Sequence, residues 1–293
     1  MRGRSFFLER YAKLGRILTG EEVTLQAVRV NSLRASDGEV TTILEGEGVH
    51  IRKIPYLDHG YEVSASTFSL GSTLEYLLGL YSLQEAASQL PVQVLRPDQG
   101  DVALDMCSAP GGKTTQMAAY MGNDGVIYAV DASRNRLYAV ENNLERCGAT
   151  NALVYHGDAV LIDLGVCFTK ILLDAPCSGN YVTDPGWFSR RTIRDVESNA
   201  ARQRRLLSRA LEVLEPGGRL LYSTCSLEPE DDELNIQWLL ENHYVDLERV
   251  DGPGVPGLTS VFGSELDRRL SNCRRLWPGG GSQGFFIAKV VKL

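Results

Sequence analysis

The chain has 293 residues, 43% hydrophobic and 23% charged, which are ordinary values for a globular protein with a sizeable core. A formal net charge of −7 excludes a uniformly basic nucleic-acid binder, so any contact with nucleic acid must come from local basic segments. No apolar run approaches ~18 residues, and the N-terminal MRGRSFFLERYAKLG has only FFL as its apolar part. We therefore expect neither a membrane span nor a secretory signal, and we expect a cytoplasmic location.

The cysteine pattern argues against a metal site. The six cysteines are Cys107, Cys147, Cys167, Cys177, Cys225 and Cys273. No two lie within four residues of each other, unlike the paired ligands of zinc sites. Without a secretory signal they are expected to be reduced thiols, and no metal is predicted.

The first part of the chain differs from the rest. Residues 1–72 are predicted to form a small α+β domain, with short strands within residues 23–36, 48–57 and 61–67. Residues 73–293 are assigned to a second, larger domain. The boundary is soft, because residues 72–91 could supply the first helices of that larger domain.

From residue 101 onward, strand and helix patterns alternate. The predicted strands are residues 101–107, 125–131, 151–158, 169–176, 219–225 and 284–293. The predicted helices are residues 111–121, 133–148, 190–214 and 229–243, with Gly148 as a C-cap and Pro216-Gly217-Gly218 as a helix stop. This alternation predicts an α/β fold, in which a mostly parallel sheet carries helices on both faces.

Aspartates end four consecutive strands of this pattern, namely Asp105, Asp131, Asp158 and Asp174. Ligands of open α/β sheets bind beyond the carboxyl ends of the strands. We therefore expect an acidic, hydrogen-bonding rim at that edge.

The turn DMCSAPGGKTTQM has the composition of a ligand-binding loop. Gly111 and Gly112 permit close approach of a ligand to the backbone, and the following helix offers free amides. The spacing is neither G-x-G-x-x-G nor that of a P-loop. Asp131, about twenty residues downstream, suits the hydroxyls of a ribose. At this point NAD, S-adenosylmethionine and a plain tight βα turn all stay open.

The tetrapeptide Asp174-Ala175-Pro176-Cys177 places a cysteine close to an aspartate, a combination that suits methylation at carbon 5 of a pyrimidine. Carbon 5 of a pyrimidine becomes nucleophilic only after a nucleophile adds to carbon 6, and a thiolate is suited to that step. An acid at ring nitrogen 3 would stabilise the adduct, and a base must then remove the carbon 5 proton. This chemistry accounts for Asp174 and one cysteine, but not for the second cysteine in LLYSTCSLEPEDDE, which is Cys225.

Seven segments in order resemble the RNA (cytosine-5)-methyltransferase family, also called the Sun or Fmu family. They are RVNSLR, GLYSLQEAAS, LDMCSAPGGKTTQM, VDASRNRL, LLDAPCSG, YSTCSLEPEDDE and RRLWPGGGSQGFFIAKV. The resemblance implies a Rossmann-like S-adenosylmethionine-dependent methyltransferase core at residues 73–293, preceded by an RNA-binding domain at residues 1–72.

The same resemblance implies roles for individual residues. Cys225 is expected to attack carbon 6 and Cys177 to assist product release, while Asp174 contacts the target base and Lys113 lies close to it. The S-adenosylmethionine site is expected to comprise Cys107, Ser108, Ala109, Pro110, Gly111, Gly112, Lys113, Asp131, Arg136, Asp158 and Asp174.

The substrate is expected to be RNA, with transfer RNA favoured because the chain is compact and ribosomal RNA as the alternative. A catalytically idle RNA-binding or ribosome-assembly factor and a nicotinamide oxidoreductase are the rival hypotheses, and a helper protein stays open as a further partner.

The arginine-rich segment from Gly186 to Arg219 and the N-terminal domain are expected to bind the RNA, although such a segment can also be a solvated helix face. Two departures from the family pattern affect target choice and the C-terminal contacts: the loop Asn180–Phe188 lacks a further glycine soon after PCSG, and Gln283 stands where an acid is common.

Overall fold

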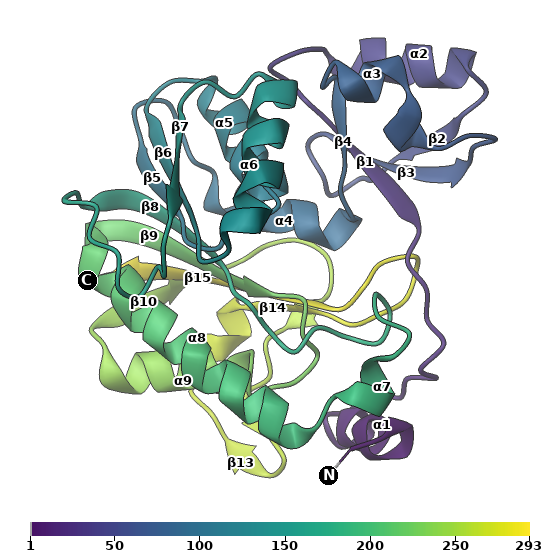
Figure 1. Ribbon diagram of the computed structural model, residues 1–293. Coiled ribbons are helices and arrows are strands. Elements are labelled where there is room, and N and C mark those ends of the chain that lie inside the picture. Colours follow the sequence, from purple (N-terminus) through teal and green to yellow (C-terminus); the bar gives the residue numbers. More distant parts are fainter. Residues whose placement is uncertain (1) are drawn as a thin grey trace. The chain divides into compact units, whose positions relative to one another are not determined.

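The computed structural model describes residues 2–293, which divide into two compact units (Figure 1). The central unit is Leu25–Leu172, and the discontinuous unit combines residues 2–24 with Leu173–Leu293. These units do not coincide with the division predicted at residues 72 and 73. The boundary falls inside strand β8 (Phe168–Asp174), whose last two residues belong to the discontinuous unit.

A small antiparallel sheet opens the central unit. Its strands are β1 (Gln26–Val30), β2 (His50–Lys53), β3 (Gly60–Ala65) and β4 (Tyr81–Leu83), in the order β2-β3-β1-β4. The helical elements beside it are α2 (Asp37–Gly46), η1 (Leu70–Ser72), α3 (Leu74–Leu77) and α4 (Ala86–Leu95). Val28, Val40, Leu44 and Tyr81 fill its core. The sheet extends past residue 72 because Tyr81 of β4 pairs with Val30 of β1.

A parallel sheet follows in the same unit. Its strands are β5 (Val102–Asp105), β6 (Val126–Asp131), β7 (Ala152–His156) and the first part of β8, in the order β8-β5-β6-β7. Helices α5 (Gly112–Met121) and α6 (Arg134–Cys147) connect the strands, as predicted. Gly148 caps α6 with a φ of +70°, which confirms its predicted role. One difference concerns Asp158, which lies two residues beyond the end of β7.

The discontinuous unit has an antiparallel sheet in the order β11-β14-β15-β9, with β10 paired to β15. Its strands are β9 (Leu214–Thr224), β10 (Val245–Glu248), β11 (Val255–Pro256), β14 (Arg274–Leu276) and β15 (Phe285–Lys292), and β12 (Ser260–Val261) with β13 (Ser264–Glu265) forms a separate hairpin. The strands of the whole chain are therefore a mixture of parallel and antiparallel pairs.

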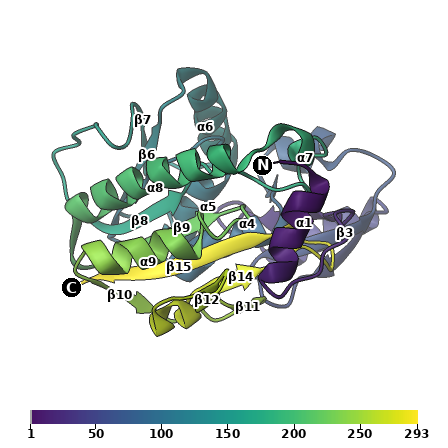
Figure 2. The ribbon, with the colours of Figure 1, turned by 90° about the horizontal axis from the view of Figure 1, so that it is seen from below.

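Two helices pack together in this unit, α8 (Ile193–Val213) and α9 (Glu233–Asn242), as Figure 2 shows from below. α8 begins at a capping box in which Thr192 and Asp195 exchange hydrogen bonds. It ends at Val213, and the Pro216-Gly217-Gly218 segment lies inside β9 rather than closing the helix. The predicted helix at residues 229–243 begins only at Glu233, because the residues before it form hydrogen-bonded turns.

Helix α1 (Arg4–Lys13) belongs to the discontinuous unit, together with α7 (Trp187–Arg190) and the 3₁₀ turn η2 (Arg268–Asn272). Its buried Phe7 meets Trp187 edge-on, with ring centroids 4.5 Å apart. The N-terminal residues therefore belong to a different unit from the small sheet with which the sequence analysis grouped them.

Candidate functional site

The loop between β5 and α5 is shaped by glycine. Gly111 has a φ of +102°, and a Cβ atom there would lie 3.0 Å from the Cα of Val140. A side chain at this position would strain the backbone and crowd α6. Gly112 begins α5 and has open space beside it, so the first amides of the helix can reach a polar ligand.

Asp131, at the end of β6, ties this loop down. Its carboxylate accepts hydrogen bonds from the amides of Ala109 at 3.2 Å and Ser133 at 2.8 Å. Arg136 lies 3.6 Å from the same carboxylate and donates to the Ala109 carbonyl at 2.6 Å. The structure therefore brings three of the predicted cofactor residues, Ala109, Asp131 and Arg136, into contact.

The remaining predicted residues of the central unit differ in exposure. Cys107, Gly112 and Lys113 are partly buried, whereas Ser108 and Gly111 are buried and Pro110 and Asp158 are exposed. Asp158 caps its own turn by accepting from the amide of Val160 at 3.0 Å. Ser108 is the most informative, because its buried Oγ has no hydrogen-bond partner among the described residues. Buried hydroxyls normally have one, so this loop fits a polar ligand such as a nucleoside cofactor.

Arg29, which the sequence analysis did not identify, contacts the first turn of α5, where this loop ends. Arg29 is 3% exposed and donates to the carbonyl of Gly112 at 2.7 Å and to the hydroxyl of Thr115 at 3.0 Å. Burial lowers the pKa of its guanidinium to about 10. The only signal in the sequence was the RVNSLR segment, which does not indicate what Arg29 contacts.

The discontinuous unit brings the two predicted thiols together. Cys225 directly follows β9, Cys177 follows β8 by three residues, and their sulfur atoms lie 3.4 Å apart. The hydrogen bond with Cys225 and then burial raise the pKa of the Cys177 thiol well above its usual value. Asn180 donates to the Cys225 carbonyl at 2.7 Å, which fixes the backbone at that residue.

Asp174 lies beside the same two segments. It is the last residue of β8, and its Oδ1 accepts a hydrogen bond from Ser223 Oγ at 2.8 Å. The amide of Ala175 donates to the Ser223 carbonyl at 2.8 Å. The segments of residues 174–177 and 223–225 therefore run side by side, and the unit collects one carboxylate and two thiols.

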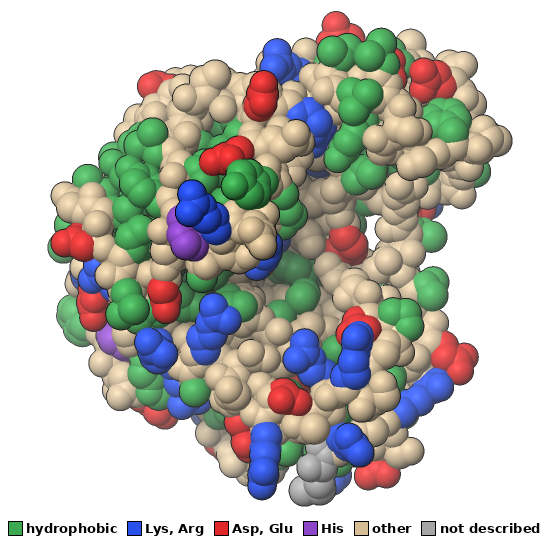
Figure 3. Space-filling model, in the orientation of Figure 1, with side chains coloured by type: hydrophobic (Ala, Val, Ile, Leu, Met, Phe, Trp, Pro, Cys, Tyr) green, Lys and Arg blue, Asp and Glu red, His purple; other side chains and the backbone are tan. Residues whose placement is uncertain are grey.

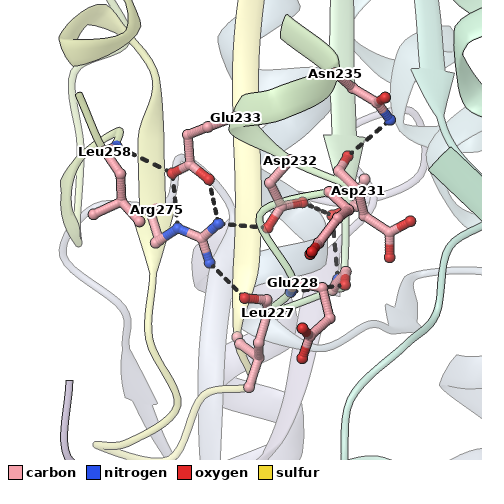
Figure 4. A network of polar contacts seen from close by, with 12 residues as sticks. Leu227, Glu228, Asp231, Asp232, Glu233, Asn235, Leu258 and Arg275 are labelled. Atoms are coloured by element: carbon pink, nitrogen blue, oxygen red, sulfur yellow. Dashed lines mark hydrogen bonds and ion pairs between the residues drawn. The ribbon is translucent and has the colours of Figure 1, made fainter. Parts of the chain in front are cut away.

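A buried acidic cluster follows Cys225 and was not anticipated as part of the site. Glu228, Asp231, Asp232 and Glu233 are each 0% exposed. Figure 4 shows the guanidinium of Arg275, also fully buried, between two of them. Arg275 lies 2.8 Å from Asp232 Oδ2, donates to Glu233 Oε1 at 2.8 Å and donates to the Leu227 carbonyl at 3.0 Å. Although burial opposes the charge, Glu233 and Asp232 raise the pKa of Arg275.

Helix α1 reaches the same cluster through Glu228. Arg10 donates to Glu228 Oε2 at 3.0 Å and Tyr11 donates to Glu228 Oε1 at 2.8 Å. Arg10 also bonds both carboxylate oxygens of Glu230 at 2.8 Å. Burial is the largest influence on Glu228 and raises the pKa of its carboxyl to about 7.

An arginine stripe lies on the outer side of α8 and consists of Arg194, Arg202 and Arg205. All three are exposed and fall within an arc of about 80° at 100° per residue. Figure 3 shows Lys and Arg side chains gathered over the part of the view where α7 and α8 lie. On the opposite side of the helix, Gln203 donates to the Pro176 carbonyl at 2.9 Å, so α8 also supports the Cys177 segment.

Residues 2–293 were predicted to hold neither a metal site nor a membrane-spanning helix. No group of three or more His, Cys, Asp or Glu side chains there could hold a metal ion. None of the helices formed by these residues has the length and apolar character needed to cross a membrane.

The chain is similar to several known proteins. A sequence model of the family described as 16S rRNA methyltransferase RsmB/F matches residues 92–291. The chain is 37% identical over 290 residues to Ribosomal RNA small subunit methyltransferase F of Erwinia tasmaniensis, covering 95% of this chain and 59% of that protein. It is also 37% identical over 277 residues to 26S rRNA (cytosine-C(5))-methyltransferase nsun-1 of Caenorhabditis elegans, covering 91% of this chain and 42% of that protein. The chain thus spans less than two thirds of the length of these relatives.

A solved structure of a methyltransferase homolog protein from Pyrococcus horikoshii matches with a TM-score of 0.89 and 41% identity. The match covers 99% of this chain and 95% of that one. This similarity confirms the predicted Rossmann-like α/β methyltransferase fold.

Proposed function

We propose, because the chain belongs to the 16S rRNA methyltransferase RsmB/F family, that it transfers a methyl group to carbon 5 of a cytosine in ribosomal RNA. The observation that carries this proposal is the pair of thiols 3.4 Å apart, with Asp174 on the adjoining segment. Carbon 5 methylation needs a nucleophile at carbon 6 and an acid at nitrogen 3, and the thiols and Asp174 are the groups proposed for these two roles.

In the proposed reaction Cys225 is the nucleophile and forms a covalent bond from its Sγ to carbon 6. The raised pKa of Cys177 keeps that thiol protonated, so its S–H can donate to the Cys225 thiolate and favour it. Asp174 hydrogen-bonds or protonates nitrogen 3 as electron density moves through the ring. After methylation a base removes the carbon 5 proton, and the Cys225 sulfur leaves with Cys177 assisting its release.

S-adenosylmethionine is the proposed cofactor and supplies an electrophilic methyl group when bound. The residues proposed to hold it are Cys107, Ser108, Ala109, Pro110, Gly111, Gly112, Lys113, Asp131, Arg136, Asp158 and Asp174. The fit rests on the unpartnered Ser108 hydroxyl and on the glycine turn that leads into the N-terminus of α5. Lys113, the second residue of that helix, is proposed to lie near the target base.

Ribosomal RNA replaces transfer RNA as the favoured substrate. The relatives are named for ribosomal RNA, which supports the alternative of the sequence analysis better than its first choice. The arginine stripe of α8 is proposed to contact RNA phosphates, with the small sheet of β1 to β4 as a second contact. The cytoplasm is kept as the proposed location.

The test is methyl transfer from labelled S-adenosylmethionine to separate pools of unmodified ribosomal and transfer RNA, with Cys225→Ala in parallel. We expect 5-methylcytosine in ribosomal RNA and none with the variant. Label confined to transfer RNA would overturn the substrate choice. Cofactor and RNA binding without any transfer would favour the idle assembly factor, and thermal stabilisation by NAD instead of S-adenosylmethionine would favour an oxidoreductase.

A further inference from the structure

We propose that the adjacent carboxylates of Asp231 and Asp232 are positioning groups that hold the two thiol-bearing segments in register. Asp231 Oδ2 accepts a hydrogen bond at 3.1 Å from the amide of Ser178, the residue after Cys177. Asp232 Oδ1 accepts one at 2.5 Å from the hydroxyl of Thr224, the residue before Cys225. One dipeptide therefore bonds to the neighbour of each thiol.

The dipeptide is itself fixed from three sides. Arg275 holds Asp232 in the buried ion pair shown in Figure 4. Tyr222 of β9 donates its hydroxyl to the Asp231 carbonyl, and Asn235 Nδ2 lies 3.4 Å from the same carbonyl. A buried hydrogen-bonded network of this kind leaves its members little freedom to shift. The carboxylates of Asp231 and Asp232 are therefore fixed in position when they accept hydrogen bonds from the two thiol-bearing segments.

Asp231 differs from the other three buried acids of the cluster in its ion pairing. Arg10 pairs with Glu228, and Arg275 pairs with Asp232 and Glu233, but no ion pair links Asp231 to any Lys, Arg or His in residues 2–293. A buried carboxylate without a cation is costly and needs strong hydrogen-bond donors. Burial raises the pKa of Asp231, and hydrogen bonds with Ser226, with the amide and side chain of Ser178 and with Gln203 oppose that rise. Because the Ser178 amide directly follows Cys177, its hydrogen bond couples Asp231 to the position of the Cys177 segment. Asp231 also contributes to the raised pKa of Cys177.

The catalytic consequence rests on the proposed function, whereas the geometric claim does not. If Cys177 assists release of Cys225 from the methylated base, losing the Asp231 acceptor slows release more than it slows attack. The variant would then lower kcat with little change in KM and would accumulate a protein–RNA adduct. How closely the two thiols are held together can be measured, through disulfide formation, with no RNA or cofactor present.

The experiment measures disulfide formation between Cys177 and Cys225 in the full chain treated with diamide. The two thiols lose two electrons and two protons, which reduce the diazene to a hydrazine, and peptide mapping identifies the Cys177–Cys225 product. Asp231→Ala removes the acceptor, Asp231→Asn keeps an amide oxygen that can accept from Ser178, and Glu230→Gln is the control from the same loop. We expect the Ala variant to form the disulfide about tenfold more slowly, because one strong hydrogen bond no longer keeps the sulfurs together. The Asn variant and the control should oxidise no more than about twofold more slowly than the original chain, since the hydrogen-bond acceptor is retained.

A second pair of variants keeps the test decisive if Asp231→Ala does not fold. Thr224→Val removes the donor to Asp232 with little change in shape, and Thr224→Ser retains it. The Val variant should be slow and the Ser variant close to the original chain. The proposal is overturned if the folded Ala or Val variant oxidises at the original rate, or if Glu230→Gln slows oxidation as much as they do. Because this assay involves no methyl transfer, its result stands apart from the test of the proposed function.

Discussion

The hydroxyl of Tyr11 donates a 2.8 Å hydrogen bond to the buried carboxylate of Glu228, although 217 positions separate the two residues in the chain. Glu228 lies three residues after Cys225, so the N-terminal helix contacts the loop that carries the proposed nucleophile. Arg10 adds an ion pair to the same carboxylate. These bonds make α1 part of the thiol-bearing unit.

Glu228→Gln should change how the free energy of unfolding depends on pH. Burial raises the pKa of Glu228 to about 7, above its value in the unfolded chain, so the folded state binds the proton more tightly. The stabilisation from this proton is present below the unfolded pKa and is lost as pH rises through the folded pKa. We expect the original chain to lose about 2 to 3 kcal/mol relative to Gln between pH 5 and 8, measured by urea unfolding. A pH-independent difference between the two proteins would contradict this.

Arg275→Met should destabilise the fold. The substitution leaves Asp232 and Glu233 buried without their cation, which typically costs about 3 to 5 kcal/mol. Neutralising the partners as well, in Arg275→Met with Asp232→Asn and Glu233→Gln, should recover much of the loss. Denaturant midpoints of the single and triple variants would show it. Equal destabilisation of both would mean that the charges are not the cause.

Asp131→Ala should weaken binding of S-adenosylmethionine. The carboxylate holds the amides of Ala109 and Ser133 and pairs with Arg136, so its loss loosens the proposed cofactor loop. A ten- to hundredfold rise in Kd corresponds roughly to losing one or two charge-assisted hydrogen bonds. Calorimetric titration would measure it, with Glu141→Gln on the exposed side of α6 as the matched control. An unchanged Kd for the Ala variant would remove Asp131 from the proposed site.

Replacing Arg194, Arg202 and Arg205 by Gln should reduce the salt dependence of RNA binding. If each side chain neutralises one phosphate of a single-stranded segment, the slope of log K against log salt falls by about 2. The single variant Arg249→Gln, which is not part of α8 and is paired with Asp251, serves as control. Binding isotherms at several salt concentrations would measure both slopes. A slope that does not change in the triple variant would mean that the stripe is a solvated helix face.

Local sequence patterns predicted much of the fold. Apolar runs located β5, β6, β8 and β15, and the glycine after Cys147 located the end of α6, because strands and helix caps depend on neighbouring residues. The family prediction is confirmed, since the motifs that carried it are contiguous segments. The two motifs predict only that Cys177 and Cys225 each follow a strand, and the 3.4 Å approach of their sulfur atoms comes from the structure.

Long-range partners were beyond the reach of those patterns. Arg275 lies more than forty residues from Asp232 and Glu233, and Arg29 more than eighty from Gly112. Residue type indicates that a buried arginine needs acceptors, but it does not say which ones. The contacts of α1 were equally beyond reach, because Phe7 and Tyr11 show only that this segment has apolar side chains and not which elements they meet.

The central claim is that Cys225 forms a bond to the target cytosine and that Cys177 assists its release. The most direct measurement incubates each single Cys→Ala variant with unmodified ribosomal RNA and S-adenosylmethionine and looks for a protein–RNA complex that survives denaturation. Cys177→Ala should accumulate such a complex, while Cys225→Ala should form none and transfer no methyl group. A complex trapped by Cys225→Ala, or normal turnover by Cys177→Ala without trapped RNA, would contradict the assignment of the two thiols.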